Sequence, residues 1–262
     1  LGDVYKRQPR PDDFQIKEAA EKIKKSKNPI IISGGGVFYS DAMEELSTFA
    51  IKHNIPVTQT VMGYSSMKRD HSHFLGPIGG LGGKAANNFA KKTDLAIAIG
   101  TKLGDFTTGS WSNFENPNFS LVSINVARFD ASKHMAQSII GDAKVSLNEL
   151  SQALGDWKAS EGWHKKSRDE LKSWNEYVDK ESGPTNQKLP IYAHAVGAIY
   201  RNSDPSDIAV TAAGGLVGEV VQIWRPRELN THETEWGFSC MSYEISGALG
   251  IKMANPNKEV IT

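Results

Sequence analysis

The chain has 262 residues with 30 basic and 30 acidic side chains, so its length accommodates two domains and its formal net charge is zero. This balance gives no electrostatic case for binding nucleic acid or an anionic membrane, and no apolar run is long enough to cross a bilayer. The single cysteine excludes an intramolecular disulfide and is typical of a reducing compartment, so we expect a cytoplasmic protein.

The first half of the chain alternates short apolar strands with helices. Residues 29–33 form an apolar, β-branched run that ends in three glycines at 34–36, which predicts a buried parallel strand leaving through a tight turn. Helical spacing follows over 41–53, with Ser40 or Asp41 available as the N-cap. This alternation predicts a parallel sheet with right-handed crossovers. Further strands are expected over 55–60, 94–100 and 121–126, and a further helix over 82–92.

The composition changes in the middle of the chain. The stretch from Trp157 to Lys188 is charged and carries three tryptophans, which predicts an amphipathic helix that wraps the first domain, followed by a linker. A second α/β pattern begins at Leu189, with a helix to about Tyr200, a strand over 208–211, a glycine pair, a helix to Trp224 and then a loop. We therefore expect an artefactual or disordered lead over 1–10, a first domain over 11–156, the helix and linker over 157–188, and part of a second domain over 189–262.

The segment GFSCMSYEISGALG, residues 237–250, is the most informative part of the sequence. It predicts an irregular stretch that turns into a helix, with Met241 placed to point at a bound ring. Ser246, Gly247 and Gly250 share one helical face and would let the helix pack very close to a neighbour. The β-branched residues over 258–262 predict a strand cut off in mid-element, so we expect a fragment of a longer protein.

Two glycine-rich turns could bind anions. The turn at 34–36 lacks the G-x-G-x-x-G spacing of a dinucleotide-binding loop, and no acidic residue closes a second strand, so nucleotide binding there is the minor alternative. The loop at 76–83 opens a predicted helix. Its amides could hold an anion, or it could be a mobile loop beside a site, and both interpretations stay open.

Histidine and cysteine give weaker signals. His71 and His73 are one residue apart in a predicted loop, and lone surface histidines are favoured there over metal ligands. Cys240 stands at a predicted helix start, where its thiol could be activated, but a buried, inert thiol is the favoured interpretation.

From about Pro11 to Thr262 the chain resembles the central domain and the opening of the C-terminal domain of thiamine-diphosphate-dependent enzymes related to acetolactate synthase. The resemblance is carried by the glycine turn after the first strand and by IPVTQT, DHSHFLGPIGGLGG, AANNFAKKTDLAIAIGTKL, SINV and GFSCMSYEISGALG. Within this family, GTKLGDFTTGSW, TAAGGLVGE and EWGFSCMSYEI are similar to the subfamily that opens a trihydroxylated cyclohexane-1,2-dione to 5-deoxy-glucuronate in myo-inositol breakdown.

The resemblance implies an α/β protein in which a Rossmann-like, parallel-sheet central domain precedes the first part of a second α/β domain that binds thiamine diphosphate. Thiamine diphosphate and Mg²⁺ would lie at a subunit interface of a homodimer or homotetramer. Met241 matches the large apolar residue that props the cofactor in a V shape. Backbone groups of Ser239 and Met241 match those that bind the aminopyrimidine. The cofactor-binding residues implied are Ala213, Gly214, Gly215, Ser239, Cys240 and Met241.

The resemblance also implies what this chain lacks. The catalytic glutamate would belong to an N-terminal domain and the Mg²⁺ ligands to a segment after Thr262, so we expect neither here and expect the chain alone to be inactive. Ser242 departs from the glycine that often follows the methionine in the wider family. Two alternatives are an acetolactate synthase-like carboligase, whose central domain can carry FAD, and a non-catalytic nucleotide-binding module. Four residues could face a hydroxylated substrate or form a capping and turn cluster, namely Asp105, Thr107, Thr108 and Ser110.

Overall fold

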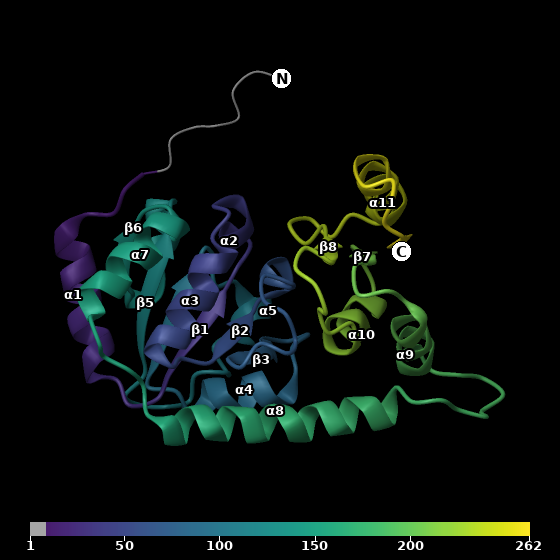
Figure 1. Cartoon of the computed structure of the whole chain (residues 1–262), viewed down its shortest axis with the longest axis horizontal. Helices are drawn as coiled ribbons and strands as arrows, with labels where there is room; N and C mark the ends of the chain where they lie inside the picture. The colour runs from purple at the N-terminus through teal and green to yellow at the C-terminus, as the bar shows by residue number, and fades with distance from the viewer. Residues whose placement is uncertain (1–8) are drawn as a thin grey trace.

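The structure, a computed structural model, describes residues 9–262 and consists of two α/β units joined by one long helix (Figure 1). Most of the lead expected over 1–10 therefore lies outside the described residues. The last two residues of this lead are described. The Pro9 carbonyl accepts a hydrogen bond from the Asp142 N–H at 2.8 Å, and Arg10 forms an ion pair with Glu149 at 2.6 Å, so both residues contact the helix that begins at Ala143. Across the described chain, no helix combines the length and apolarity that a membrane span requires.

The first unit is built on a six-stranded parallel sheet in the order β3-β2-β1-β4-β5-β6. The strands are β1 (Pro29–Ser33), β2 (Val57–Gln59), β3 (Phe74–Pro77), β4 (Leu95–Ile99), β5 (Ser120–Asn125) and β6 (Gln137–Ile140). The helices are α1 (Asp13–Lys25), α2 (Gly36–Tyr39), α3 (Met43–His53), α4 (Lys84–Lys92), α5 (Asp105–Thr108), α6 (Arg128–Ala131) and α7 (Ala143–Leu154), with short 3₁₀ turns η1 (Val61–Gly63) and η2 (Lys133–Met135).

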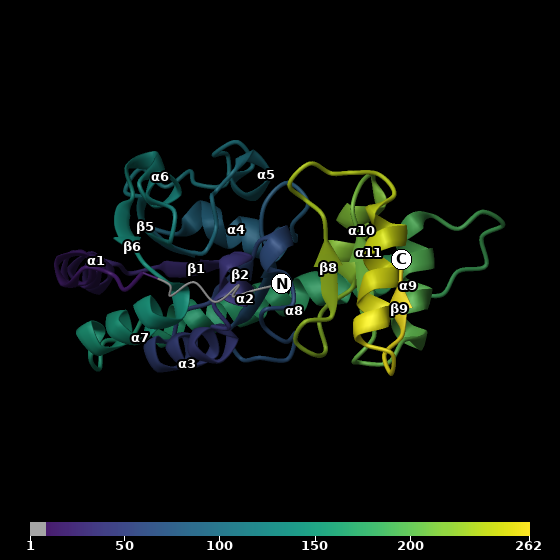
Figure 2. The ribbon, with the colours of Figure 1, turned by 90° about the horizontal axis from the view of Figure 1, so that it is seen from above.

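Helices cover both faces of this sheet, with α3 and α7 on one face and α4 on the other (Figure 2). Every residue of β1 and β4 is buried, which explains why these strands are continuous apolar runs rather than alternating ones. The predicted strand at 29–33 is confirmed with its bounds. The predicted N-cap of α3 is wrong, because Asp41 turns the chain with a φ of 48° and Ala42 precedes the helix without a side-chain bond.

The glycine turn at 34–36 is a packing feature of the sheet. The Gly34 N–H donates to the Ile99 carbonyl at 2.8 Å, and the Gly36 N–H donates to the Gly100 carbonyl at 2.9 Å. A Cβ on Gly34 would lie 2.5 Å from the Gly100 oxygen, so the chains leaving β1 and β4 can only meet here without side chains. Two of the three amides in the turn are therefore used inside the protein and are not free to hold a phosphate.

The second unit is a three-stranded parallel sheet in the order β8-β7-β9. Its elements are α9 (Tyr192–Asn202), β7 (Ile208–Thr211), α10 (Leu216–Ile223), β8 (His232–Thr234), α11 (Tyr243–Ala254) and β9 (Val260–Ile261). The strand predicted over 208–211 is confirmed, as is the helix after 237–242, whereas β8 lies where a loop is predicted.

The helix α11 packs through a different face from the one predicted. Ala248 is buried and, with Tyr243 and Ile251, packs in a cluster that includes two side chains of β7. An added Cβ on Gly250 would meet nothing within 4 Å, so the small-residue face does not approach a neighbour within this chain. The spacing of Ala248 and Ile251 decides which face is buried. Ser246 and Gly250 are exposed, whereas an added Cβ on Gly247 would lie 2.8 Å from the Tyr243 ring of the same helix.

The helix predicted between Trp157 and Lys188 is α8 (Glu161–Glu181), which runs along both units (Figure 1). Ser160 caps its start by accepting a hydrogen bond from the Trp163 N–H at 3.2 Å. Trp163 is buried, and its indole N–H donates to the Pro29 carbonyl at 2.8 Å. The amphipathic face of α8 thus covers the first unit near the start of β1 before the chain enters α9.

Candidate functional site

Two loops leave the carboxyl ends of the neighbouring strands β7 and β8. The first is the turn at 212–215 and the second is the segment at 235–242, which leads directly into α11. Because parallel strands end at the same edge of a sheet, the two loops lie together. The Ser239 hydroxyl reaches the Ala212 carbonyl at 3.4 Å. The structure therefore places the two loops that carry the six residues predicted to bind the cofactor next to each other.

The turn at 212–215 presents open backbone. Gly214 has a φ of +86°, a conformation that favours glycine, and an added Cβ on Gly214 or Gly215 would meet nothing within 4 Å. The Ala213 N–H donates to a carboxylate oxygen of Glu244, in the first turn of α11, at 3.2 Å. Hydrogen bonds from the backbone N–H groups of Glu244 itself and of Ala213 hold the pKa of this carboxyl below its usual range.

The segment at 235–242 is an exposed loop held by a carboxylate. One oxygen of Glu235 accepts from the Phe238 N–H at 2.8 Å and the other from the Cys240 N–H at 2.7 Å. These bonds, the one from Phe238 first, lower the pKa of the Glu235 carboxyl. Ser239 and Ser242 have φ values of 53° and 74°, in the left-handed region that non-glycine residues disfavour.

The side chains at the tip of this loop face solvent. Met241 is 84% exposed, and Cys240 is a free, exposed cysteine. The prediction of a buried thiol is wrong because the loop projects beyond the sheet edge and no element of the described chain covers it. The Met241 side chain is thus free to contact a bound ring, as the resemblance implies.

The two loops fit the groups of thiamine diphosphate. Backbone without a Cβ at Gly214 and Gly215 leaves room for a diphosphate to approach the chain closely, and a large, exposed apolar side chain at Met241 can support a ring. Among residues 9–262 no group of three or more His, Cys, Asp or Glu side chains could hold a metal ion. We assign no Mg²⁺ ligand in this part of the chain.

A cavity of about 730 Å³ lies on the other side of the second loop, over the carboxyl ends of the first sheet. Trp236 and Phe106 both line it and pack edge to face, with ring centroids 5.0 Å apart. Of the four polar residues predicted to face a substrate or to form a turn, Asp105 and Thr107 line this cavity. Thr108 instead accepts from the Trp111 N–H at 3.3 Å, and its role is that of a turn residue.

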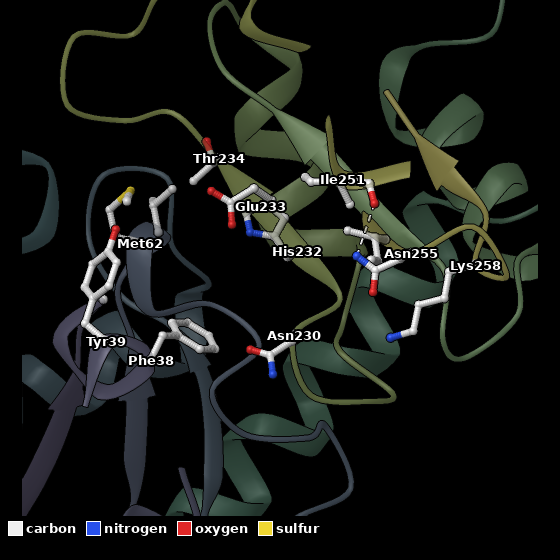
Figure 3. A pocket seen from close by; sticks show the side chains of 13 residues that line it. Phe38, Tyr39, Met62, Asn230, His232, Glu233, Thr234, Ile251, Asn255 and Lys258 are labelled. Atoms are coloured by element: carbon white, nitrogen blue, oxygen red, sulfur yellow. Dashed lines mark hydrogen bonds between the residues drawn. The ribbon is translucent and has the colours of Figure 1, made fainter. Parts of the chain in front are cut away.

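A smaller cavity of about 400 Å³ separates α2 from β8 (Figure 3). Tyr39 approaches it from the first unit, whereas His232 and Glu233 approach it from β8 and Lys258 from beyond α11. Burial lowers the pKa of His232 to about 4, so this imidazole is neutral near pH 7. None of the residues predicted to bind the cofactor lines this cavity.

The glycine-rich loop at 76–83 uses its amides within the protein. The Gly79 N–H donates to the Asn87 side-chain oxygen at 2.9 Å, the Gly80 N–H to the Phe106 carbonyl at 2.7 Å, and the Gly83 N–H to the Pro77 carbonyl at 2.7 Å. An anion would have to displace these acceptors. The geometry therefore favours a structural role for this loop over anion binding.

The loop histidines are not lone surface residues. His73 is 6% exposed, and its ring stacks on that of His164 in α8 with centroids 4.1 Å apart. Burial and, to a lesser degree, the nearby His164 lower the pKa of His73 to about 3. The surface prediction is wrong for His73 because α8 folds back over the loop, a contact between residues far apart in sequence.

Two residues of the site are missed by sequence reasoning, Glu235 and Glu244. Both lie inside the motif EWGFSCMSYEI, at either end of the loop. The sequence does not indicate their roles, because a carboxylate that binds backbone amides has the same sequence signature as one that faces water.

The fold is that of an α/β protein with a six-stranded and a three-stranded parallel sheet, and we call the turn at 212–215 and the segment at 235–242 together the cradle. Residues 16–150 match the thiamine pyrophosphate enzyme central domain, and the chain belongs to this family, which confirms the predicted resemblance and fold class. Similar proteins include the 3D-(3,5/4)-trihydroxycyclohexane-1,2-dione hydrolases of Bacillus anthracis (36% identical over 95% of this chain), Geobacillus thermodenitrificans (34% over 98%) and Clostridium perfringens (37% over 94%). The chain spans 42% to 43% of the length of these relatives.

Proposed function

We propose that the chain is part of a thiamine-diphosphate-dependent hydrolase that breaks a C–C bond of a trihydroxycyclohexane-1,2-dione to give 5-deoxy-glucuronate in inositol catabolism. The observation that carries the proposal is the pair of open loops at the ends of β7 and β8, attached to a central domain of this enzyme family. The names of the relatives supply the substrate. The functional protein is a homodimer or homotetramer in this proposal.

The residues of the cradle have distinct roles in the proposal. The backbone of Ala213, Gly214 and Gly215 holds the diphosphate, whose charge Mg²⁺ neutralises. Backbone groups from Ser239 to Met241 hold the aminopyrimidine, and the Met241 side chain supports the cofactor from below. When bound, thiamine diphosphate supplies an electron sink next to the substrate carbonyl, which is what a C–C cleavage needs.

The chain by itself is inactive in this proposal, because it spans 42% of the length of the relatives. We expect calorimetric titration of the 262-residue chain with thiamine diphosphate and Mg²⁺ to give a dissociation constant weaker than about 1 mM, since a diphosphate without a complete cation site is costly to bind. Micromolar affinity would contradict this part of the proposal.

A chimera tests the function itself. The chain would replace the matching segment of the Bacillus anthracis relative, and the purified chimera would be assayed with the cyclic dione and, separately, with pyruvate. We expect opening of the dione and no condensation of pyruvate. Condensation of pyruvate would favour the carboligase, and a folded chimera that binds the cofactor but acts on neither compound would overturn the substrate assignment.

A second candidate function is a nucleotide-binding module. The 730 Å³ cavity favours this candidate, because the cavity lies at the carboxyl ends of the strands of the first sheet, where open α/β sheets bind their ligands. The amides of Gly34 and Gly36, which donate to Ile99 and Gly100, count against a phosphate at the glycine turn. Absorbance of the purified chain above the protein band, together with analysis of the supernatant after acid precipitation, detects FAD or another nucleotide. An equimolar bound nucleotide other than FAD would favour this candidate, whereas bound FAD would fit the carboligase as well.

A further inference from the structure

Each loop of the cradle is fixed by one glutamate, and we propose that Glu235 and Glu244 are positioning residues that set the two loops in their binding conformation before the cofactor arrives. The inference rests on the proposed function, because it assigns roles toward thiamine diphosphate. Neither residue touches the cofactor in this proposal. Each acts through the backbone that does.

Glu235 holds the second loop with both of its carboxylate oxygens. One accepts from Phe238 at 2.8 Å and the other from Cys240 at 2.7 Å, on either side of Ser239. Ser239 has a left-handed backbone, which a non-glycine residue keeps only when surrounding bonds impose it. The two bonds from Glu235 flank this residue and supply that constraint. They therefore determine where Met241, the next residue but one, places its side chain.

Glu244 ties the first loop to α11. Its carboxylate accepts from the Ala213 N–H at 3.2 Å, next to the open backbone of Gly214. The residue lies in the first turn of the 12-residue helix α11, where the helix dipole also favours a negative charge. Through this bond, α11, which follows the second loop, fixes the turn at 212–215, which is the first loop. The two glutamates together set the separation of the loops.

The two glutamates hold their loops differently: Glu235 uses both carboxylate oxygens, one for the Phe238 amide and one for the Cys240 amide, whereas Glu244 reaches the Ala213 amide through one oxygen. A glutamine at 235 would present one oxygen and one NH₂ group to two N–H donors, so at least one bond is lost. A glutamine at 244 can keep its oxygen on Ala213. We therefore expect Glu235→Gln to loosen its loop, Glu244→Gln to be tolerated, and Glu244→Ala to loosen the first loop.

Cys240 is a built-in reporter of the second loop, because it is the only cysteine and is exposed. In the 262-residue chain we expect Glu235→Gln to raise the rate of Cys240 alkylation by iodoacetamide about fivefold or more, since the loop opens once the carboxylate no longer holds the Phe238 and Cys240 amides. Cleavage by chymotrypsin after Phe238 should quicken about tenfold. The matched control is Glu115→Gln, which removes a surface carboxylate paired with Lys91 in the first unit.

The outcomes separate this inference from the proposed function. Unchanged alkylation and cleavage in a Glu235→Gln chain with wild-type circular dichroism would overturn the role of Glu235, whatever the protein binds. In the chimera, we expect Glu235→Gln and Glu244→Ala each to raise the thiamine diphosphate concentration needed for half-maximal activity about tenfold or more. We expect kcat at saturating cofactor to stay within about threefold of the parent chimera's. An unaltered half-saturation constant would overturn the inference. A parent chimera that does not bind the cofactor would instead overturn the proposed function.

Discussion

Gly63 lies where the chain after β2 passes the end of β1. A Cβ at this position would lie 2.2 Å from the Ser33 carbonyl oxygen, a distance that only a backbone shift can relieve. We expect Gly63→Ala to lower the free energy of unfolding by about 1–3 kcal/mol. Gly162→Ala is the control, because an added Cβ there meets nothing within 4 Å in the first turn of α8, and it should stabilise the chain by up to about 1 kcal/mol. Urea unfolding followed by tryptophan fluorescence measures both, and equal effects would contradict the packing explanation.

His232 makes the stability of the chain depend on pH. Burial lowers its pKa from 6.5 to about 4, so between these values the unfolded chain binds a proton that the folded chain does not. The stabilisation is complete above pH 6.5 and is lost as the pH falls toward 4, at a rate of at most about 1.4 kcal/mol per pH unit. His73, with its pKa lowered to about 3, acts in the same direction.

Substitution isolates this effect through the slope of stability against pH. We expect His232→Gln to reduce the fall in unfolding free energy between about pH 6.5 and pH 5, whatever its effect at neutral pH. His134→Gln replaces an exposed histidine and serves as the control. Urea unfolding over this range measures the slopes, and parallel curves for His232→Gln and the unaltered chain would exclude His232 as the titrating group.

At the scale of single residues, sequence reasoning predicts which loops are neighbours but misjudges burial. The six residues predicted to bind the cofactor lie on two adjacent loops, because the motif fixes which loops follow which strands, and their binding role stays a prediction. The predictions for Cys240 and His73 are wrong in opposite directions: the thiol predicted to be buried is exposed, and the histidine predicted to lie on the surface is buried. Both errors have one cause. The burial of a loop residue is decided by whichever distant segment covers it, and no local pattern records that segment.

Asn87 controls the shape of the loop between β3 and α4. Its side chain accepts from the Gly79 N–H and donates to the Gly79 carbonyl, both at 2.9 Å. We expect Asn87→Ala to cost about 1–3 kcal/mol and to speed hydrogen exchange of the Gly79 and Gly80 amides, because two backbone groups lose their partner. Asn88→Ala, whose side chain reaches only the Glu170 carboxylate at 3.3 Å, is the control and should cost less than about 1 kcal/mol. Residue-by-residue measurement of amide hydrogen exchange tests this prediction. An unprotected Gly79 amide in the unaltered chain would refute the role of Asn87.

At the scale of elements, prediction succeeds where a strand is apolar along its whole length. β1 and β4 are buried on both faces, so the apolar run itself marks the strand. β3, β6 and β8 are missed. β3 contains a glycine and a proline, β6 begins with the polar pair Gln-Ser, and β8 is the three residues His-Glu-Thr. Their strand conformation comes from pairing with β2, β5 and β7, which is a tertiary effect.

At the scale of the whole molecule, a polar network around Tyr200 connects the first unit, the long helix and the second unit. The Arg69 guanidinium of the first unit donates to the Tyr200 hydroxyl at 2.7 Å, and this hydroxyl donates to the Arg225 carbonyl at 3.0 Å. The Arg225 side chain is 6% exposed, pairs with Asp179 near the end of α8 and donates to Asn175 at 3.3 Å. The first unit, the long helix and the second sheet thus meet in one network. The sequence shows the charges but not this convergence, because the partners are up to 131 positions apart.

This polar network should determine whether the two units unfold together. Arg225→Met keeps much of the buried volume while removing the bonds to Asp179 and Asn175, and it leaves Asp179 solvated because that carboxylate is 59% exposed. We expect a loss of about 1–3 kcal/mol, concentrated in the second unit, so that one heat-capacity peak becomes two. Lys172→Met, which removes an exposed charge pair within α8, is the control and should keep one peak. Scanning calorimetry distinguishes the two variants. A single, unshifted peak for Arg225→Met would mean that apolar packing along α8 and α10, rather than the arginine network, couples the two units.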